Sequence, residues 1–157
     1  MGERFKIILS VLALSISIGC GSNKGTTEVR KKPKNIILLI GDGMGLSQVS
    51  ASYFFKETTP NFERFNTIGL IKTSAADALV CDSAASATAY ATGVATYNGA
   101  IAVDMQKQAV PTIIEIITAK HISTGIISTS SIMHATPASF YAHVSSRKSY
   151  DEIASYI

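Results

Sequence analysis

The sequence predicts an α/β fold with a mostly parallel central sheet. Short apolar, β-branched runs alternate along the chain with segments that have helix signals. The clearest of these runs is continuous rather than alternating, which is typical of a strand buried on both faces of a parallel sheet. Polar residues of unusual type follow the runs. In such folds, functional groups gather in the loops beyond the carboxyl ends of the strands.

Three strands are expected. The first is Asn35–Ile40, which ends at Gly41, the second is Gly69–Thr73, and the third is Thr124–Ser128. The loops that follow them are 41–45, 74–83 and 129–136, and these loops contain the candidate functional residues. No internal repeat is visible.

Helices are expected between these strands. Leu46–Phe55 is helix-like, and the alanine-rich segment Asp82–Thr92 ends at Gly93, a glycine just past a helix end. Tyr97–Gly99 contains an Asn-Gly turn signal. Pro111 opens a helix that runs through Lys120.

The last part of the chain has two further helix signals. Pro137–His143 is expected to start a helix. Ser149–Ile157 reads as a helix that has no Gly or Pro stop signal, which indicates that the sequence is a fragment.

Residues 1–19 are predicted to be a secretory signal peptide. Arg4 and Lys6 precede the 12-residue apolar stretch Ile7–Ile18, which is too short for a membrane-spanning helix of about 20 residues. The Gly19-Cys20 junction resembles a bacterial lipobox, although Ser17 replaces the usual leucine. We therefore expect lipidation of Cys20 and an exported, periplasmic or membrane-anchored lipoprotein. An ordinary cleaved signal is the alternative.

Residues 20–34 form a flexible, basic tether in this interpretation. The excess of positive charge that gives the whole chain its net charge of +3 comes from this segment and the signal. From Asn35 onward, seven Lys and Arg residues face nine Asp and Glu, a net charge of −2. The globular part therefore lacks the excess of basic residues that is typical of a nucleic-acid-binding domain. With Cys20 lipidated, only Cys81 remains, and no intrachain disulfide can form.

The segment Gly41–Gly45 offers a carboxylate, Asp42, at the end of the first strand. Its glycines lack the spacing of a dinucleotide fingerprint or a P-loop. Asp42 could bridge metal ions, because little bulk surrounds it. Taken alone, an Asp in a Gly-rich turn is usually a turn residue.

Ser83 lies where a helix N-terminus is expected, after the suitable N-cap Asp82. Backbone N–H groups in such a position favour an anion. The simpler interpretation is a capped core helix. Cys81 is a rival nucleophile, but cysteine phosphatases have an arginine about six residues later, and this chain has Ala87 there. Cys81 is therefore interpreted as a buried small residue.

His134 and Thr136 follow the third strand, and one residue separates them, so both can face the same side. Arg147 has a planar fork suited to two phosphate oxygens. Each residue also has an ordinary explanation: His134 and Arg147 as surface side chains, and Thr136 as the start of a helix. His121 and His143 are interpreted as structural.

Together these segments resemble alkaline phosphatases. The matching stretches are Asn35–Gly45, Asp82–Ala89, Gly93 with Thr96–Gly99, and His134–Pro137 with His143 and Ser146–Lys148. The resemblance implies that residues 35–157 are the N-terminal part of the alkaline phosphatase domain. It also implies a three-layer α/β/α sandwich, incomplete in this fragment.

The resemblance also implies roles for individual residues. Ser83 would be the nucleophile that forms a phosphoserine, and Arg147 would bind substrate phosphate. Asp42 would bridge one of two zinc ions and a magnesium ion, and Thr136 would ligate the magnesium. His134 stands where relatives have Asp or His, so it would bind magnesium less directly or favour another metal.

The expected activity is metal-dependent hydrolysis of small-molecule phosphate monoesters, in a family whose members are commonly dimers. The remaining zinc ligands of the family lie downstream, so residues 1–157 alone are expected to be inactive. One alternative is a phosphodiesterase branch of the same superfamily, which commonly uses threonine. The sulfatase signature is absent. The other alternative is a non-catalytic phosphate- or metal-binding lipoprotein relic.

Overall fold

The computed structural model describes residues 34–157. The predicted signal peptide, Cys20 and the tether up to residue 33 lie outside this range. The chain divides into two units, residues 1–39 and 40–157. The candidate residues Asp42, Ser83, His134, Thr136 and Arg147 all belong to the second unit. Among the described residues, no helix is both long and apolar enough to cross a membrane.

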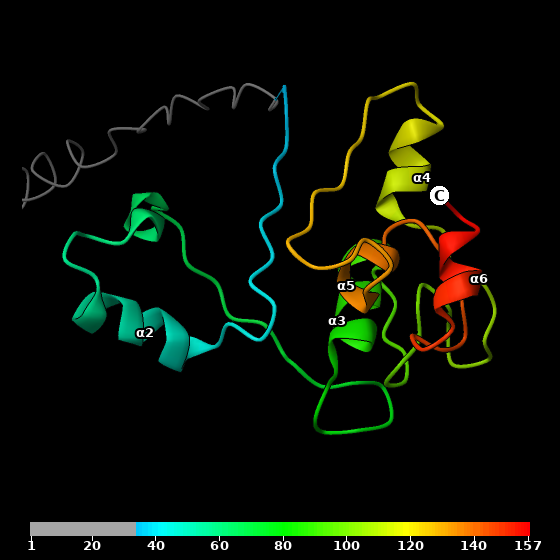
Figure 1. Cartoon of the computed structure of the whole chain (residues 1–157), viewed down its shortest axis with the longest axis horizontal. Coiled ribbons are helices and arrows are strands. Elements are labelled where there is room, and N and C mark those ends of the chain that lie inside the picture. The colour runs from blue at the N-terminus through cyan, green and yellow to red at the C-terminus, as the bar shows by residue number, and fades with distance from the viewer. Residues whose placement is uncertain (1–33) are drawn as a thin grey trace, which may run out of the picture. The chain divides into compact units, whose positions relative to one another are not determined.

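Helices provide the regular structure of residues 34–157 (Figure 1). They are α2 (Leu46–Phe55), the 3-10 helix η1 (Asn61–Arg64), α3 (Ser83–Thr92), α4 (Ile113–Thr118), α5 (Ala135–Ala138) and α6 (Tyr150–Ala154). The prediction for α2 is confirmed at both ends, although none of its residues is buried.

Helix α3 confirms the prediction of a capped, alanine-rich helix. The side chain of Asp82 accepts a hydrogen bond from the Ala85 N–H over 2.9 Å, which satisfies one of the free donors at the helix start. Gly93 ends the helix with φ of 76°, in the left-handed region that glycine adopts without steric cost. The helix therefore fixes Ser83 as its first residue.

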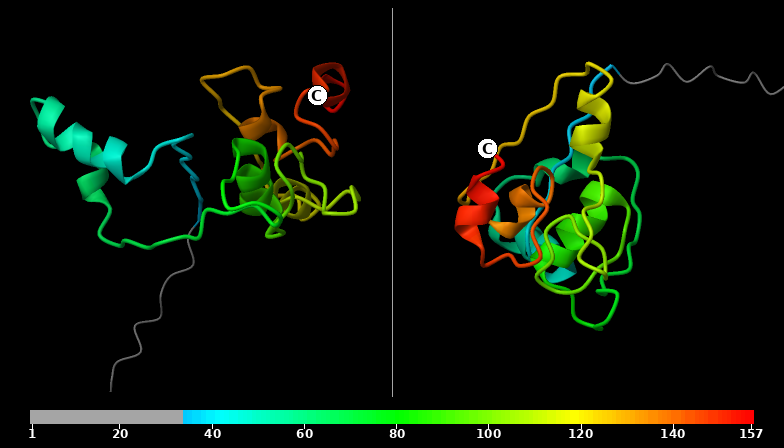
Figure 2. Two further views of the ribbon diagram at one scale, coloured as in Figure 1. Left: turned by 90° about the horizontal axis from the view of Figure 1, so that it is seen from below. Right: turned by 90° about the vertical axis from the view of Figure 1, so that its right-hand side faces the viewer.

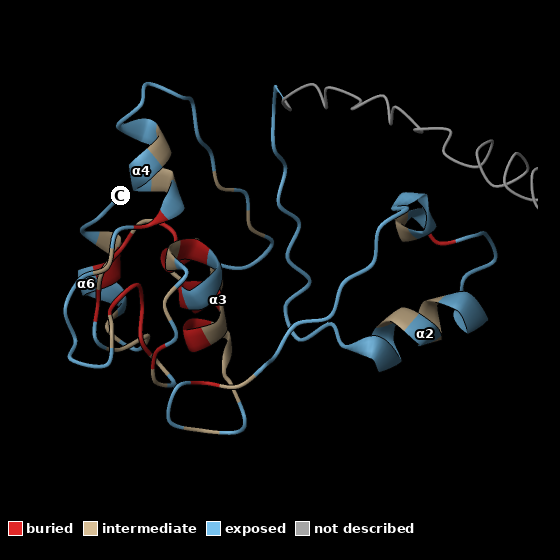
Figure 3. Ribbon diagram, turned by 180° about the vertical axis from the view of Figure 1, so that it is seen from behind, coloured by how far each residue is buried: buried red, intermediate tan, exposed pale blue. Residues whose placement is uncertain are grey.

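The core forms where α3 packs against α5, and the two helices lie side by side in both views of Figure 2. It consists mostly of small side chains: Ala84, Ile101, Ala135, Ala138, Ala142, Val144 and Ile153. Figure 3 shows buried residues on both helices. Alanines allow the helix backbones to approach closely, so the first turns of α3 and α5 are close together in the fold.

A buried hydroxyl fixes α3 against the chain that follows it. The Thr88 hydroxyl donates to the Ala100 carbonyl over 3.0 Å and accepts from the Ala102 N–H over 2.9 Å. Thr88 is fully buried, so both bonds are shielded from water. They hold residues 100–102 beside the helix.

The prediction of three strands is wrong for residues 34–157. None of the segments Asn35–Ile40, Gly69–Thr73 and Thr124–Ser128 forms a strand there. The β-type backbone pairing in this range consists of two isolated antiparallel bridges, Ile101–Val144 and Val103–Ala109. The predicted segments are among the exposed stretches in Figure 3, and Leu70 and Ile127 are 99% and 100% exposed. A strand is stabilised by hydrogen bonds to a neighbouring strand. These segments have no such neighbour among the described residues.

The later helices are shorter than predicted. The predicted helix Pro111–Lys120 is α4, which begins after Thr112 because Thr112 and Glu115 form a capping box. The helix predicted at Pro137–His143 is α5, which starts two residues before the proline.

Proline is tolerated there because the N–H groups of the first turn have no partner within the helix. The predicted helix at Ser149–Ile157 ends at Ala154.

Candidate active site

Ser83 is the first residue of a ten-residue helix, and its side chain is only partly covered. Asp82 is the N-cap, so its carboxylate lies beside the serine. The backbone N–H groups of the first turn and the helix dipole favour an anion at this position. Ser83 is thus placed where a phosphate group could approach it.

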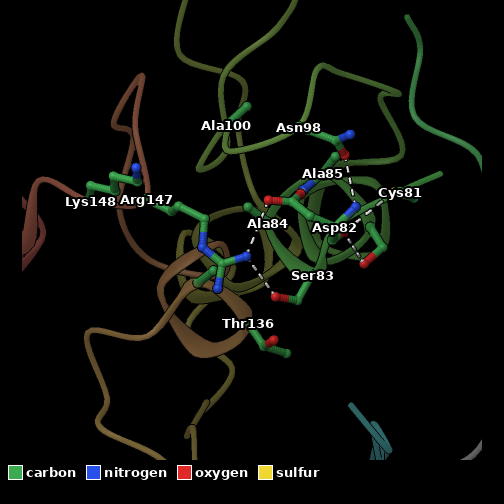
Figure 4. A network of polar contacts seen from close by, with 12 residues as sticks. Cys81, Asp82, Ser83, Ala84, Ala85, Asn98, Ala100, Thr136, Arg147 and Lys148 are labelled. Atoms are coloured by element: carbon green, nitrogen blue, oxygen red, sulfur yellow. Dashed lines mark hydrogen bonds and ion pairs between the residues drawn. The ribbon is translucent and has the colours of Figure 1, made fainter. Parts of the chain in front are cut away.

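Arg147 connects to Ser83 and to the N-cap through one nitrogen. Its Nη1 donates to the Ser83 hydroxyl oxygen over 2.9 Å and to Asp82 Oδ2 over 3.1 Å, as Figure 4 shows. The Arg147 and Asp82 side chains are 26% and 29% exposed, so water screens the ion pair only in part. The backbone N–H of Arg147 donates to the Gly99 carbonyl over 2.8 Å, which fixes the start of the side chain.

The pKa of Asp82 lies below its ordinary value of 3.8. Partial burial by itself would raise this pKa. Hydrogen bonds from the Ala85 N–H and from the Arg147 guanidinium, together with the arginine charge, outweigh the burial. Asp82 therefore remains an anion at neutral pH and keeps Arg147 next to Ser83.

Thr136 and His134 are both at the start of α5, which packs on α3. The Thr136 hydroxyl donates to Asp42 Oδ2 over 2.7 Å. His134 is the N-cap of α5, and its Nε2 is 3.5 Å from Arg147 Nη2. In the view of Figure 4, Thr136 appears below the contact between Ser83 and Arg147. The first turn of α5 thus lies between the arginine and the carboxylate of Asp42.

The structure therefore brings together the five candidate residues that lie in the described range. Ser83 contacts Arg147, Arg147 approaches His134, and Thr136 contacts Asp42. They come from four segments of the chain: the loop with Asp42, the start of α3, the start of α5, and the segment before α6 that contains Arg147. The sixth predicted functional residue, Cys20, lies outside the described residues.

Cys81 is not arranged as a nucleophile. Its Sγ donates to the Asp82 carbonyl over 3.3 Å. Burial, and then the negative charge of Asp82, raises the pKa of the thiol. Because the thiolate is the reactive form, a raised pKa lowers its reactivity.

The described donors fit part of a magnesium site. The carboxylate of Asp42 and the hydroxyl of Thr136 are hard oxygen ligands of the kind that Mg²⁺ prefers. Zinc usually needs three or four protein ligands. Residues 34–157 contain no group of three or more His, Cys, Asp or Glu side chains placed to hold an ion. They therefore do not complete a zinc site.

Sequence reasoning missed two parts of this arrangement. Asp82 was predicted only as an N-cap, but it also binds Arg147. Asn98 was predicted only as a turn residue, but its side chain binds the backbone at Asp82 over 2.7 Å. An Asn-Gly pair signals a turn, whereas nothing local signals a bond to a residue 16 positions away.

His143 is interpreted as structural, and its contacts agree with that role. Nδ1 is 2.9 Å from the Ala102 carbonyl oxygen, and Nε2 is 2.9 Å from Glu115 Oε1. The pair borders an open hollow of about 500 Å³ that is also lined by Ala109, Pro111 and Ile116. None of the candidate active-site residues lines this hollow.

Comparison with known proteins identifies a family. The family model described as alkaline phosphatase matches residues 33–156. The alkaline phosphatase of Escherichia coli K12 is 46% identical over an alignment that covers 76% of this chain and 28% of that protein. Alkaline phosphatase 4 of Bacillus subtilis 168 is 40% identical over 98% of this chain and 37% of its own length.

Solved structures agree with these relatives. The alkaline phosphatase of the Antarctic bacterium TAB5 superposes with a TM-score of 0.77 and 56% identity, covering 79% of this chain and 36% of that one. A variant of that protein, with aspartate in place of a histidine, has magnesium in its M3 site. The chain thus spans roughly a third of the length of the relatives that it matches.

Proposed function

Since the chain belongs to the alkaline phosphatase family, we propose that the whole protein hydrolyses small-molecule phosphate monoesters through a phosphoserine on Ser83. The observation that supports this most directly is the contact of Ser83 with Arg147 at the N-terminus of α3. A hydroxyl, a cation and the start of a helix lie together here. Such an arrangement orients a phosphate for transfer to a serine.

Arg147 would bind the phosphate of the substrate. Its Nη1 already donates to Ser83, so a phosphate near the hydroxyl can accept from the other guanidinium N–H groups. The carboxylate of Asp82 keeps the guanidinium in place through Nη1. The first turn of α3 would supply further donors to the phosphate oxygens.

The described residues can orient a phosphate but cannot ionise Ser83. A helix N-terminus stabilises a negative charge by about 0.3–1 kcal/mol and at most about 2 kcal/mol. Bringing the pKa of bound water down to about 7, as a zinc ion does, corresponds to on the order of 12 kcal/mol. Zinc, when bound, lowers the pKa of an oxygen ligand by such an amount.

The proposed metals are two zinc ions and one magnesium ion. Asp42 and Thr136 would hold magnesium, since both are oxygen donors in mutual contact. Asp42 and Ser83 would contribute to a zinc site whose other ligands lie beyond the described residues. His134 would bind magnesium less directly than an aspartate or favour another metal. The magnesium named for the TAB5 variant supports one such ion here.

Residues 1–157 alone are proposed to bind zinc poorly and to turn over little or no substrate. The absence of a three-ligand group among residues 34–157 supports this. Release of phosphate by purified 1–157 with added zinc is the test. Sustained turnover comparable to that of the full-length protein would contradict the proposal.

The experiment that tests the function uses the full-length protein that contains this chain. Hydrolysis of p-nitrophenyl phosphate should be lost in Ser83→Ala and retained in Ser123→Ala, which alters an exposed serine outside the site. Undiminished turnover by Ser83→Ala would refute the assignment of the nucleophile. A preference for bis-p-nitrophenyl phosphate would instead assign the protein to the phosphodiesterase branch.

The central sheet of the proposed three-layer sandwich would form from the three exposed apolar segments when further strands pair with them. The TM-score of 0.77 supports this part of the proposal. In the full-length protein, the amides of 36–40, 69–72 and 125–128 should be protected from hydrogen exchange. Rapid exchange at all three segments would exclude them from a sheet.

Export, lipidation of Cys20 and dimer formation complete the proposal. The charged start, the apolar stretch and the Gly19-Cys20 junction support export and lipidation, and the dimer rests on family resemblance. Mass spectrometry of the mature N-terminus should find an acylated Cys20, and Cys20→Ser should release the protein from membranes. Sedimentation of the full-length protein tests for the dimer.

A further inference from the structure

Asn98 binds the backbone on both sides of Cys81, just before the nucleophile. Its Oδ1 accepts from the Asp82 N–H over 2.7 Å, and its Nδ2 donates to the Val80 carbonyl over 2.9 Å. Both ends of the amide are therefore used. Val80 is 81% exposed, so packing does little to fix this loop. The hydrogen bonds from Asn98 are a direct restraint on the segment that leads into Ser83.

The same turn also holds the segment of Arg147. The Gly99 carbonyl accepts from the Arg147 N–H over 2.8 Å, and the Tyr97 hydroxyl donates to the Ser145 carbonyl over 2.8 Å. Gly99 has φ of 93°, a conformation that a residue with a Cβ adopts only under strain. The turn 97–99 is thus hydrogen-bonded both to the segment that precedes Ser83 and to the segment around Arg147.

We propose that Asn98 is a positioning residue that sets the geometry between the Ser83 hydroxyl and the Arg147 guanidinium. It acts through Asp82: the amide fixes the Asp82 backbone, and the Asp82 carboxylate then binds Arg147 Nη1. In Figure 4, Asn98 lies beside Asp82, on the side away from Thr136. Its hydrogen bonds go to the loop backbone and not to Ser83 or Arg147. This inference rests on the proposed function.

A double-mutant cycle in the full-length protein tests the proposal, with p-nitrophenyl phosphate as substrate. A misplacement of about 1 Å in a catalytic group can cost roughly 100-fold in rate. We expect Asn98→Ala to lower kcat/KM by about 10- to 100-fold. In an Arg147→Ala background, the same change should cost no more than about threefold, because the geometry that it maintains no longer matters. Equal losses in both backgrounds would overturn the proposal.

Two further variants separate positioning from stability. Asn66→Ala removes an exposed asparagine that makes no side-chain hydrogen bond within residues 34–157 and should leave kcat/KM unchanged. Asn98→Asp keeps an acceptor for the Asp82 N–H but sets a carboxylate oxygen against the Val80 carbonyl, so its kcat/KM should stay below that of the wild type. If Asn98→Ala does not fold, Asn98→Asp is used in the cycle. A loss of kcat/KM in Asn66→Ala as large as that in Asn98→Ala would contradict the proposal.

The outcomes also separate this inference from the function on which it rests. If Ser83→Ala retains full turnover, the phosphoserine mechanism fails whatever Asn98 does. If Ser83→Ala is inactive while Asn98→Ala has wild-type kcat/KM, only the positioning role fails.

Discussion

The Thr136 hydroxyl donates to the Asp42 carboxylate over 2.7 Å, although 94 positions separate the two residues in the chain. The contact joins the first turn of α5 to the glycine-rich loop 41–45. It gathers two oxygen donors that suit magnesium. Because α5 packs on α3, the same contact places the Asp42 loop near the helix that begins with Ser83.

The first prediction concerns magnesium. Thr136→Val has a similar shape but no hydroxyl, so the full-length protein should need roughly tenfold more Mg²⁺ for half-maximal activity, as when a supporting metal contact is lost. Thr136→Ser keeps the hydroxyl and is the matched control. Titration of the chelated protein with Mg²⁺ measures this. An unchanged Mg²⁺ requirement in Thr136→Val would exclude Thr136 as a ligand.

The second prediction concerns substrate phosphate. Arg147→Ala removes charge-assisted hydrogen bonds of about 1.5–3 kcal/mol each, so kcat/KM should fall by about 100-fold or more. Inorganic phosphate should also inhibit the variant more weakly. Lys148→Ala removes the neighbouring cation, which is exposed, and should change kcat/KM little. Comparable losses in the two variants would point to general attraction by charge rather than to a phosphate contact.

The third prediction follows from the lowered pKa of Asp82. A carboxyl group whose pKa is lower in the folded state stabilises the fold above its ordinary pKa, here 3.8, and loses that contribution as pH falls through the folded value. The urea concentration at the unfolding midpoint of the wild type should decrease as the pH is lowered from about 5 to about 3. Asp82→Asn should show a smaller fall.

Asp77→Asn is the matched control for Asp82. It removes an exposed carboxylate without a hydrogen-bond partner among residues 34–157. Its urea midpoint should follow the wild-type curve. An acid-induced fall of the same size in Asp82→Asn and in the wild type would mean that Asp82 contributes nothing to it.

The fourth prediction concerns Glu115 and His143. Glu115 accepts from the Thr112 N–H over 2.7 Å and lies 2.9 Å from His143 Nε2. Burial alone would raise the pKa of Glu115, but its bonds with Thr112 and His143 lower it. The ionised Glu115 therefore stabilises the fold, and this stabilisation is lost on acidification. A double-mutant cycle with Glu115→Gln and His143→Gln at pH 6 should show a coupling of about 0.5 kcal/mol or more.

Glu115 is 46% exposed, so solvent screening keeps this coupling well below that of a buried pair. Glu152→Gln, at an exposed position in α6, is the control and should show no coupling with His143→Gln. A coupling of zero for Glu115 would reduce its role to the capping of α4.

Local signals predicted α3 well because its determinants lie within the helix. Asp82 caps the first turn, the alanines favour a helix, and Gly93 ends it. The residues of the site were predicted from motifs, and the structure brings Asp42, Ser83, His134, Thr136 and Arg147 together. Their catalytic roles stay predictions.

The three strands were predicted wrongly, because strand formation depends on partners that are distant in sequence. The run Asn35–Ile40 has the composition of a buried strand, yet Ile37 is 83% exposed in the described chain. The roles of Asn98 and Asp82 were missed for a similar reason. Their hydrogen bonds connect residues 16 and 65 positions apart, and local sequence does not specify such pairs.

The most direct test of the account is to identify the residue that carries phosphate during turnover. The full-length protein would be mixed with ³²P-labelled phosphate monoester, quenched in acid and digested, and the labelled peptide would be sequenced. We predict one labelled serine, Ser83, and no label in Ser83→Ala. Label on another residue, or turnover without label in the wild type under conditions that preserve phosphoserine, would contradict the central claim.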